Sequence, residues 1–176
     1  ISDVEGSGSI VSNGKFKGKS LKWLLKEYNS RLVGKNVFNR FGTKFPLLIK
    51  FIDAAENLSV QLHPNDEIAQ KRHNSFGKTE MWYIMQADKD AELILGFKDV
   101  LTKQEYIKLV ENNKILTALN SECVKVGDAF IINPGLVHAI GAGVVLAEIQ
   151  QTSDITYRIY SFNCYFIDLC RNQNAF

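Results

Sequence analysis

The residues best suited to chemistry gather in and after the segment 58–82, LSVQLHPNDEIAQKRHNSFGKTEMW. Gln61 and His63 are two positions apart, and side chains two apart on a strand point to the same face of a sheet. If this stretch is a strand, an amide oxygen and an imidazole can reach one ion together, and Glu80 can add a carboxylate from a following strand. His138, in INPGLVHAI, is the other well-placed histidine. These four residues predict a metal site with nitrogen and oxygen ligands, suited to zinc or, less specifically, to iron, manganese or nickel.

The surrounding sequence predicts mostly short strands that would hold these residues. Apolar runs and alternating patterns indicate strands near 9–11 and at 45–56, 58–63, 80–87, 91–97, 123–126, 129–134, 138–140, 144–151 and 156–162. Their even spacing, with Gly and Asp at the turns, is typical of a small double-sheet jelly roll. We expect the strands at 80–87 and 91–97 to pair with each other around the turn at Asp88. The strand at 45–56 is expected to be buried, with Lys50 marking an edge or extending its amine to solvent.

Three helices are predicted between the strands. One covers about residues 20–33, with Ser20 as its N-cap and apolar side chains at helical spacing behind it. A short helix follows Pro64 and runs through Lys71. The third covers residues 102–119 and opens with a capping box, TKQE. No internal repeat or linker is visible, so we expect residues 1–176 to form a single domain.

Composition narrows the class of protein. The chain has 176 residues, 45% of them hydrophobic and 23% charged, which is ordinary for a globular domain. A net charge of +2 with no basic stripe argues against a nucleic-acid partner, and no apolar run is long enough to cross a membrane. Cys123, Cys164 and Cys170 are odd in number and form no C-x-x-C pair, so we expect reduced thiols, a cytoplasmic location and no disulfide framework. The oligomeric state is left open.

Four motifs in order carry a family resemblance: LSVQLHP, GKTEMWYI, NPGLVHAI and EIQQTSDITYRIY. Together they resemble the type I mannose-6-phosphate isomerases, a zinc-dependent branch of the cupin fold, from about Ile1 to Tyr160. The resemblance implies a mainly β, cupin-type jelly roll, a double-sheet β-barrel with inserted α-helices. The turn at Gly135 resembles the second cupin motif, which aims His138 into the barrel. After Tyr160 the sequence departs from the family pattern, and we expect the chain to be the metal-bearing centre of a longer enzyme.

The resemblance also implies an activity and roles for particular residues. It implies an aldose–ketose isomerase that interconverts mannose 6-phosphate and fructose 6-phosphate through a cis-enediol, with one Zn²⁺ per chain held by the four predicted ligands. Arg158 matches the catalytic arginine, whose charge can stabilise developing negative charge. Glu148 or Asp154 is a candidate for the proton-transferring base, or either could orient Arg158, and His138 or a metal-bound water stays possible. The remaining positions match residues near the sugar phosphate or the catalytic centre: Lys50, Ser59 and Lys78.

Each of these residues also has a simpler interpretation. A histidine beside a glutamine on a strand is usually an ordinary polar pair, His138 could be an edge residue, and the lysines could be solvated. His73 is expected to be a solvated loop residue. Two other functions use the same ligand types. One is a metal-dependent cupin oxygenase with iron or manganese, and the other is a sugar-phosphate-binding module without catalysis.

Overall fold

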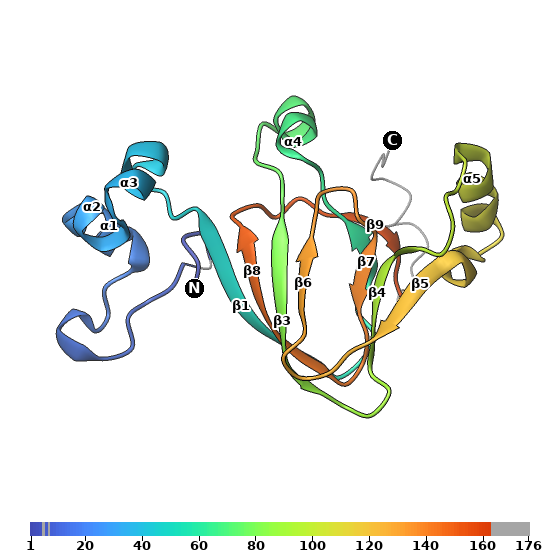
Figure 1. Cartoon of the computed structure of the whole chain (residues 1–176). Helices are drawn as coiled ribbons and strands as arrows, with labels where there is room; N and C mark the ends of the chain where they lie inside the picture. The colour runs from blue at the N-terminus through green and yellow to red at the C-terminus, as the bar shows by residue number, and fades with distance from the viewer. Residues whose placement is uncertain (5, 7, 163–176) are drawn as a thin grey trace.

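Two antiparallel β-sheets packed face to face form the body of the molecule (Figure 1). The computed structural model describes residues 1–4, 6 and 8–162. One sheet has four strands in the order β1 (Leu47–Ala54), β8 (Val144–Gln151), β3 (Glu80–Ala87) and β6 (Ala129–Ile132). The other has five in the order β5 (Leu119–Cys123), β4 (Glu92–Phe97), β7 (His138–Ile140), β2 (Val60–Leu62) and β9 (Tyr157–Tyr160). The predicted double-sheet fold with inserted helices is confirmed.

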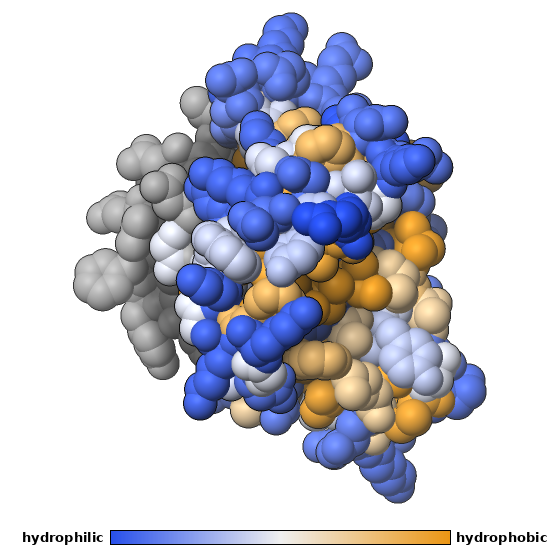
Figure 2. Space-filling model, turned by 90° about the vertical axis from the view of Figure 1, so that its left-hand side faces the viewer, coloured by the Kyte–Doolittle hydropathy of each residue, from blue (hydrophilic) through white to orange (hydrophobic). Residues whose placement is uncertain are grey.

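The outer face of the four-stranded sheet carries two rows of residues without charged side chains. Strand pairing aligns two rows of outward-pointing residues across all four strands, and these eight residues are named the outer sheet face: Ile49, Ile149, Met81 and Ile131 in one row, and Phe51, Ala147, Tyr83 and Ala129 in the other. None of the eight is charged. Figure 2, which views the molecule from the side of the amino-terminal helices, shows apolar side chains gathered toward the right of the view.

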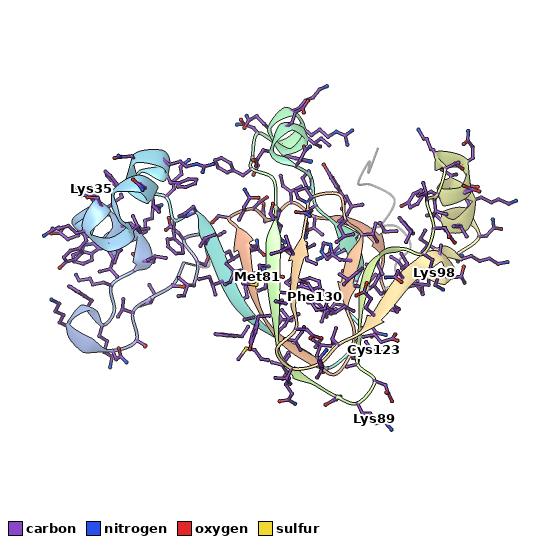
Figure 3. The ribbon with its side chains drawn as sticks, in the orientation of Figure 1. Lys35, Met81, Lys89, Lys98, Cys123 and Phe130 are labelled. Atoms are coloured by element: carbon purple, nitrogen blue, oxygen red, sulfur yellow. The ribbon has the colours of Figure 1, made fainter. Side chains whose placement is uncertain are left out.

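The inward-pointing residues of the two sheets build the main core. Trp82, Ile84 and Leu146 from the four-stranded sheet meet Leu93 and Ile140 from the five-stranded sheet, and all five are buried. Figure 3 labels Phe130, which packs against this core between the sheets. Alternation is strict in β8, where every second residue is buried, as one buried face of an antiparallel strand requires.

A second apolar cluster covers the outer face of the five-stranded sheet. Val60, Leu119 and Ala139 are buried there, and Leu116 and Phe162 pack against them. Leu116 belongs to the 3-10 helix η2 (Ile115–Ala118), which follows α5 (Lys103–Glu111). The five-stranded sheet therefore has apolar partners on both of its faces.

The helices follow their predicted capping signals but differ in extent. The first predicted helix is split at Asn29, which has a φ of 49°, into α1 (Leu21–Tyr28) and α2 (Ser30–Val33), and α3 (Lys35–Phe41) was not predicted. Ser20 caps α1 by accepting a hydrogen bond from the Trp23 amide. The capping box of α5 is present, but the α-helix ends at Glu111 rather than continuing to residue 119. A further short helix, α4 (Asp66–His73), extends two residues beyond its predicted end.

Four strand predictions were wrong. β3 and β4 do not pair with each other, because the turn after Asp88 carries the chain from one sheet into the other. In a sandwich, this places Ile84 and Leu93 across the core from each other instead of side by side. β1 is an edge strand in which only Ala54 is buried, and Phe51 is 74% exposed. Near residues 9–11 there is only an isolated bridge, and the strand predicted at 123–126 is β5, which ends at Cys123.

Of the three cysteines and the divergent carboxyl-terminal segment, the structure describes only a part. Cys123 is exposed and is a free thiol, whereas Cys164 and Cys170 lie outside the described residues, as does most of the divergent segment after Tyr160. Within the described part, no helix is long and apolar enough to cross a membrane.

Candidate metal centre

Three of the four predicted ligands meet at one end of the space between the sheets. Glu80 is the first residue of β3, His63 directly follows β2, and His138 opens β7 after the turn at Gly135. The Gly135 amide donates to the His63 carbonyl at 2.8 Å, so the two histidine-bearing segments are tied together. Val60 is buried in the second cluster on the opposite side of the sheet, and this confirms the predicted alternation along β2.

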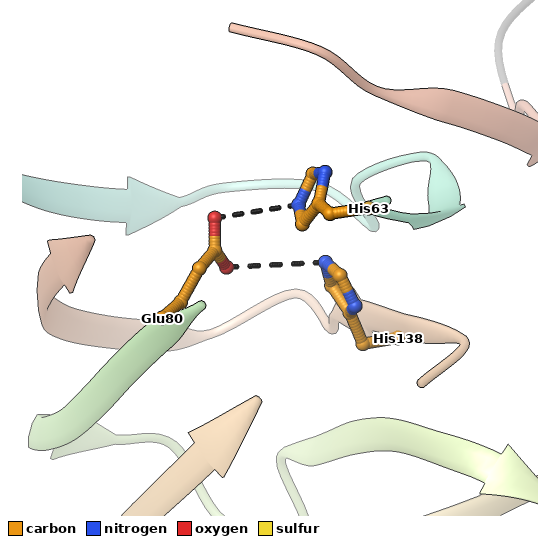
Figure 4. Close-up of side chains that lie close together, drawn as sticks. All are labelled: His63, Glu80 and His138. Atoms are coloured by element: carbon orange, nitrogen blue, oxygen red, sulfur yellow. Dashed lines mark ion pairs between the residues drawn. The ribbon is translucent and has the colours of Figure 1, made fainter. Parts of the chain in front are cut away.

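The ligand atoms are close enough to share one ion. His63 Nε2 lies 3.3 Å from Glu80 Oε1, and His138 Nε2 lies 3.9 Å from Glu80 Oε2 (Figure 4). Each of these three residues is only 1% exposed, and their ligand atoms all lie within 4.8 Å of one another. Around a tetrahedral zinc ion, bonds of about 2.0–2.1 Å separate neighbouring ligand atoms by roughly 3.4 Å. The observed spacings agree with a single small cation.

Backbone hydrogen bonds fix how both imidazoles face the site. His63 Nδ1 donates to the Ile155 carbonyl, and His138 Nδ1 donates to the Leu136 carbonyl, each at 2.9 Å. With the proton on Nδ1, a neutral imidazole directs its Nε2 lone pair toward Glu80. His63 Nε2 is buried and has no hydrogen-bond partner among the described residues. Two acceptors 3.3 Å apart repel each other unless a proton or a metal ion lies between them, so these residues fit a metal.

The charges around Glu80 favour its ionised form. Lys78 Nζ lies 2.8 Å from Glu80 Oε1, and the two side chains are 7% and 0% exposed. Burial by itself raises the pKa of Glu80, but a proton shared with His63 in the metal-free chain and the charge of Lys78 outweigh it and lower that pKa to about 2. Burial lowers the pKa of His138 to about 4, despite its bond to the Leu136 carbonyl. At neutral pH the centre therefore offers a carboxylate and a neutral His138.

Lys78 is held in place by a loop that requires glycine. The Lys78 amide donates to the Pro64 carbonyl, and the preceding Gly77 amide donates to Asp66 Oδ1 at 2.8 Å. A Cβ on Gly77 would meet the backbone nitrogen of Asp66 at 2.5 Å, so no larger residue fits without moving the start of α4. The GKTE motif thus fixes Lys78 and Glu80 relative to the segment after β2 that carries His63.

Trp82 joins two carboxylates and was not singled out in the sequence. Its Nε1–H donates to Glu80 Oε2 and to Glu148 Oε2, each at 3.1 Å. Glu148 also accepts from Lys50 Nζ at 2.8 Å, and Lys50 in turn bonds Gln150 at 2.7 Å. The alternation that turns Glu80 inward also turns Trp82 inward, and this was the available signal. The result is a hydrogen-bonded path from the metal centre to β1.

A cavity of about 110 Å³ beside the metal centre brings most predicted site residues together. Six of them line it: Lys50, Ser59, Gln61, Lys78, His138 and Glu148. Arg158 pairs with Gln61 across β2 and β9 but is exposed and is not part of the lining. Asp154 is also exposed, in the loop between β8 and β9, and lies outside the lining.

The Gln61 amide is next to the cluster with its nitrogen toward it. Gln61 Nε2 lies 3.4 Å from His138 Nε2, where it can donate to the imidazole lone pair. The oxygen and nitrogen of an amide exchange places when its terminal bond turns by about 180°. Gln61 can therefore present its oxygen to an ion at the same place without any backbone movement.

His73, predicted to be a solvated loop residue, is exposed to solvent but lies in a helix and not in a loop. It is the last residue of α4, and its Nε2 is hydrogen-bonded to the Tyr157 hydroxyl at 2.7 Å, although the side chain is exposed. His63 and His73 thus both bind the segment that leads into β9, at Ile155 and Tyr157. This contact connects α4 to the strand that carries Arg158.

Comparison with known proteins gives the family. A model of the catalytic domain of type I phosphomannose isomerases matches residues 5–109. Mannose-6-phosphate isomerase ManA of Bacillus subtilis is 44% identical over 156 residues, 88% of this chain and 48% of the relative. The probable mannose-6-phosphate isomerase GmuF of the same organism is 40% identical over 172 residues, 97% of this chain and 50% of the relative. The chain therefore spans about half the length of these relatives.

Solved structures agree with this assignment. The crystal structure of the mannose 6-phosphate isomerase from Bacillus subtilis is 34% identical with a TM-score of 0.81, and the match covers 96% of this chain and 52% of that one. A mannose 6-phosphate isomerase bound with zinc and yttrium, 17% identical, shares the fold at a TM-score of 0.65 over 86% of this chain and 59% of its own. Since the catalytic-domain model matches more than half of the sequence, this chain belongs to the type I phosphomannose isomerase family.

Proposed function

We propose that the chain carries the metal centre of a zinc-dependent isomerase that interconverts mannose 6-phosphate and fructose 6-phosphate through a cis-enediol. The observation that carries the proposal is the buried lone pair of His63, which faces ionised Glu80 beside a cavity lined with cations and a second carboxylate. That combination suits a small anionic substrate whose carbonyl must be polarised. The relatives, which are mannose-6-phosphate isomerases, supply the substrate class.

In this proposal Gln61, His63, Glu80 and His138 hold one zinc ion. Two neutral imidazoles, an amide oxygen and one carboxylate leave the ion a formal charge of about +1. When bound, the ion supplies positive charge that polarises the sugar carbonyl and stabilises the negative charge that develops during enolisation.

The proton transfers are assigned to residues that line the cavity. Glu148 takes the C2 proton of the open-chain aldose, and the electron pair left behind forms the C1–C2 double bond of the cis-enediol. Lys78, whose amine is buried at the cavity wall, gives a proton to the carbonyl oxygen at C1. Glu148 then returns its proton to C1 while O2 loses its proton to Lys78, and the ketose results. Atoms and charge balance over the two steps.

Glu148 is preferred to Asp154 as the base because of where the two carboxylates lie. Glu148 is 4% exposed, lines the cavity and is oriented by Lys50 and Trp82. Asp154 is exposed and outside the lining. We assign Lys50 and Ser59, which line the same cavity, to the sugar phosphate. Arg158, beside Gln61 on the neighbouring strand, is assigned to the charge that develops in the transition state.

The test is a matched pair of carboxylate variants, Glu148→Gln and Asp154→Asn. Both are made in the 176-residue chain and at the equivalent positions of the full-length Bacillus subtilis relative. Zinc content is measured by elemental analysis, and turnover by a coupled assay for fructose 6-phosphate. Glu148→Gln should keep the zinc and lose at least a hundredfold in kcat, in line with general base catalysis, whereas Asp154→Asn should stay close to wild type. The opposite pattern would assign the base to Asp154, and a protein without zinc would refute the metal centre.

A sugar-phosphate-binding module without catalysis is the second candidate, because the chain spans only about half the length of its relatives. It predicts that the purified chain binds zinc and mannose 6-phosphate, measured by calorimetry, but forms no fructose 6-phosphate. The full-length relative in the same assay is the positive control. Membership of an isomerase family does not support the oxygenase alternative.

A further inference from the structure

One buried indole N–H lies between two carboxylates. Trp82 is 1% exposed, and its Nε1 lies 3.1 Å from Glu80 Oε2 and 3.1 Å from Glu148 Oε2. Both distances are slightly longer than the usual length of about 2.9–3.0 Å for a hydrogen bond from N–H to oxygen. Equal and slightly long distances are typical of a three-centre bond, in which two acceptors share a single hydrogen.

The two carboxylates have matching surroundings. Lys78 Nζ lies 2.8 Å from Glu80 Oε1, and Lys50 Nζ lies 2.8 Å from Glu148 Oε1. In each carboxylate a lysine therefore binds one oxygen and Trp82 binds the other. Because each acceptor has a cation beside it, neither has a clear advantage in attracting the indole hydrogen, which agrees with the equal distances.

A bound metal ion would make the two acceptors unequal. Glu80 belongs to the cluster of candidate ligand atoms with His63 and His138, and Glu148 does not. A divalent cation on Glu80 draws negative charge from both oxygens of that carboxylate, so Oε2 becomes a weaker acceptor. A buried N–H without an acceptor costs free energy, so Trp82 must keep a partner. Glu148 is then the stronger of the two.

We propose that Trp82 is a positioning residue that fixes Glu148 when the metal centre is loaded. This inference rests on the proposed function, in which Glu148 is the base. In the metal-free chain Trp82 divides its hydrogen bond between Glu80 and Glu148, and in the loaded chain the bond goes to Glu148 alone and shortens. Each carboxylate oxygen can accept twice, so Glu148 keeps a free site for the substrate proton.

The packing around Trp82 makes the indole a fixed donor. Its ring meets the His138 ring edge to face, with the centroids 5.4 Å apart and the planes at 83°, and the rest of the side chain belongs to the main core. The hydrogen bond can therefore transfer through a small rotation of a carboxylate, without movement of the ring. The base is then held most firmly when an ion is present to polarise the substrate carbonyl.

The test is the indole N–H signal of Trp82 in proton–nitrogen NMR spectra of the 176-residue chain, with chelator and then with equimolar zinc. The sequence has two tryptophans, and Trp23→Phe identifies the signal of Trp82. In the wild type, zinc should move the Trp82 signal downfield, because the bond to Glu148 shortens. Trp23 lies in α1, outside the two sheets (Figure 1), and its signal is the internal control that should not move.

Glu148→Gln is the decisive variant, because it replaces the second carboxylate by a neutral and weaker acceptor. Without metal, the Trp82 N–H should then bond mainly to ionised Glu80. Zinc should weaken that bond and move the Trp82 signal upfield, opposite to the wild type. The opposite directions separate a transferred hydrogen bond from a general change in the local field. The variant keeps all four candidate ligands, so elemental analysis should find the zinc content of the wild type.

Two results would overturn this inference alone. One is bound zinc with a Trp82 signal that does not move, and the other is a signal that moves in the same direction in the wild type and in Glu148→Gln. A chain that binds no zinc would overturn the inference together with the metal centre of the proposed function. Elemental analysis of the same samples distinguishes these cases.

Discussion

Lys78 and Lys50 each pair with a buried carboxylate, yet their replacement by methionine should have very different costs. Lys78 lies 2.8 Å from Glu80, and both side chains are almost fully buried, at 7% and 0% exposed. Lys50 lies 2.8 Å from Glu148, but its side chain is 39% exposed, so water can take the place of its amine. Methionine keeps the length of the apolar stem in both cases. The comparison therefore isolates the charge.

In the metal-free protein at neutral pH, Lys78→Met should lower the free energy of unfolding by about 3–5 kcal/mol, the usual cost of leaving a buried charge unpaired. Lys50→Met should cost about 1 kcal/mol or less, as for partly exposed ion pairs. Zinc should restore much of the loss in Lys78→Met, because a cation beside Glu80 replaces the lost positive charge. It should change the smaller cost of Lys50→Met very little.

Urea denaturation of both variants and wild type, with chelator and then with zinc, measures these differences. Equal losses for the two variants would refute the reasoning, since burial would then not set the cost of breaking the pair. A Lys78→Met penalty that zinc leaves unchanged would show that Lys78 acts by packing rather than by its charge.

Three further predictions concern the other side chains of the centre. His63→Ala should lose bound zinc in elemental analysis, whereas His73→Ala, which removes a histidine outside the cluster, should keep it; equal zinc in both would remove His63 from the ligand set. Gln61→Glu should keep the zinc but lower kcat in the full-length relative, because an added negative charge takes the formal charge of the site from about +1 to about 0 and weakens its pull on a carbonyl; unchanged kcat would contradict this. The pKa of His138 is lowered from its ordinary value of 6.5 to about 4 in the folded chain. The unfolded chain therefore binds more protons in this window, and the metal-free protein should lose about 3 kcal/mol of stability as the pH falls from about 6.5 through 4. His138→Gln should flatten that loss in urea titrations at several pH values, and an unchanged slope would assign it to other groups.

The positions of the candidate ligands followed from local rules. Alternation along one strand was enough to place Gln61 and His63 on the same face, whereas the inward direction of His138 was expected only from the resemblance of its turn to the second cupin motif. The helix starts at Ser20 and Thr102 were predictable for the same reason, since a capping side chain acts within three residues of itself.

The features that depend on distant partners could not be predicted. A tight turn after Asp88 is compatible with a hairpin or with a crossing between sheets, and only the pairing of β3 with β8 decides between them. Trp82 bridges two carboxylates because Glu148, 66 residues later, is brought beside it. The segment 45–56 was interpreted as a buried strand because most of its residues are apolar, although the exposure of a residue such as Phe51 depends on what covers the sheet.

Near the metal centre, the strands direct charged side chains between the sheets and apolar side chains toward the outside, which reverses the usual preference for apolar residues inside. Near the centre Glu80 and Glu148 face inward, while Met81 and Ile149 on the same strands face outward. A shift of the strand pairing by one residue would exchange these faces, so that the apolar side chains became buried and the carboxylates exposed. Hydrophobic burial alone would favour this shifted pairing. The native register must therefore be fixed at the far end of the same strands, where Leu146 and its neighbours face inward.

The metal centre is thus a locally frustrated part of the fold, held in place by packing at a distance. Substitutions that loosen the far apolar end, such as those at Leu146, give the strands access to the slipped pairing. Loss of the site can then begin at residues that touch neither the ion nor the substrate, and the earliest change would be a shift in strand register rather than unfolding.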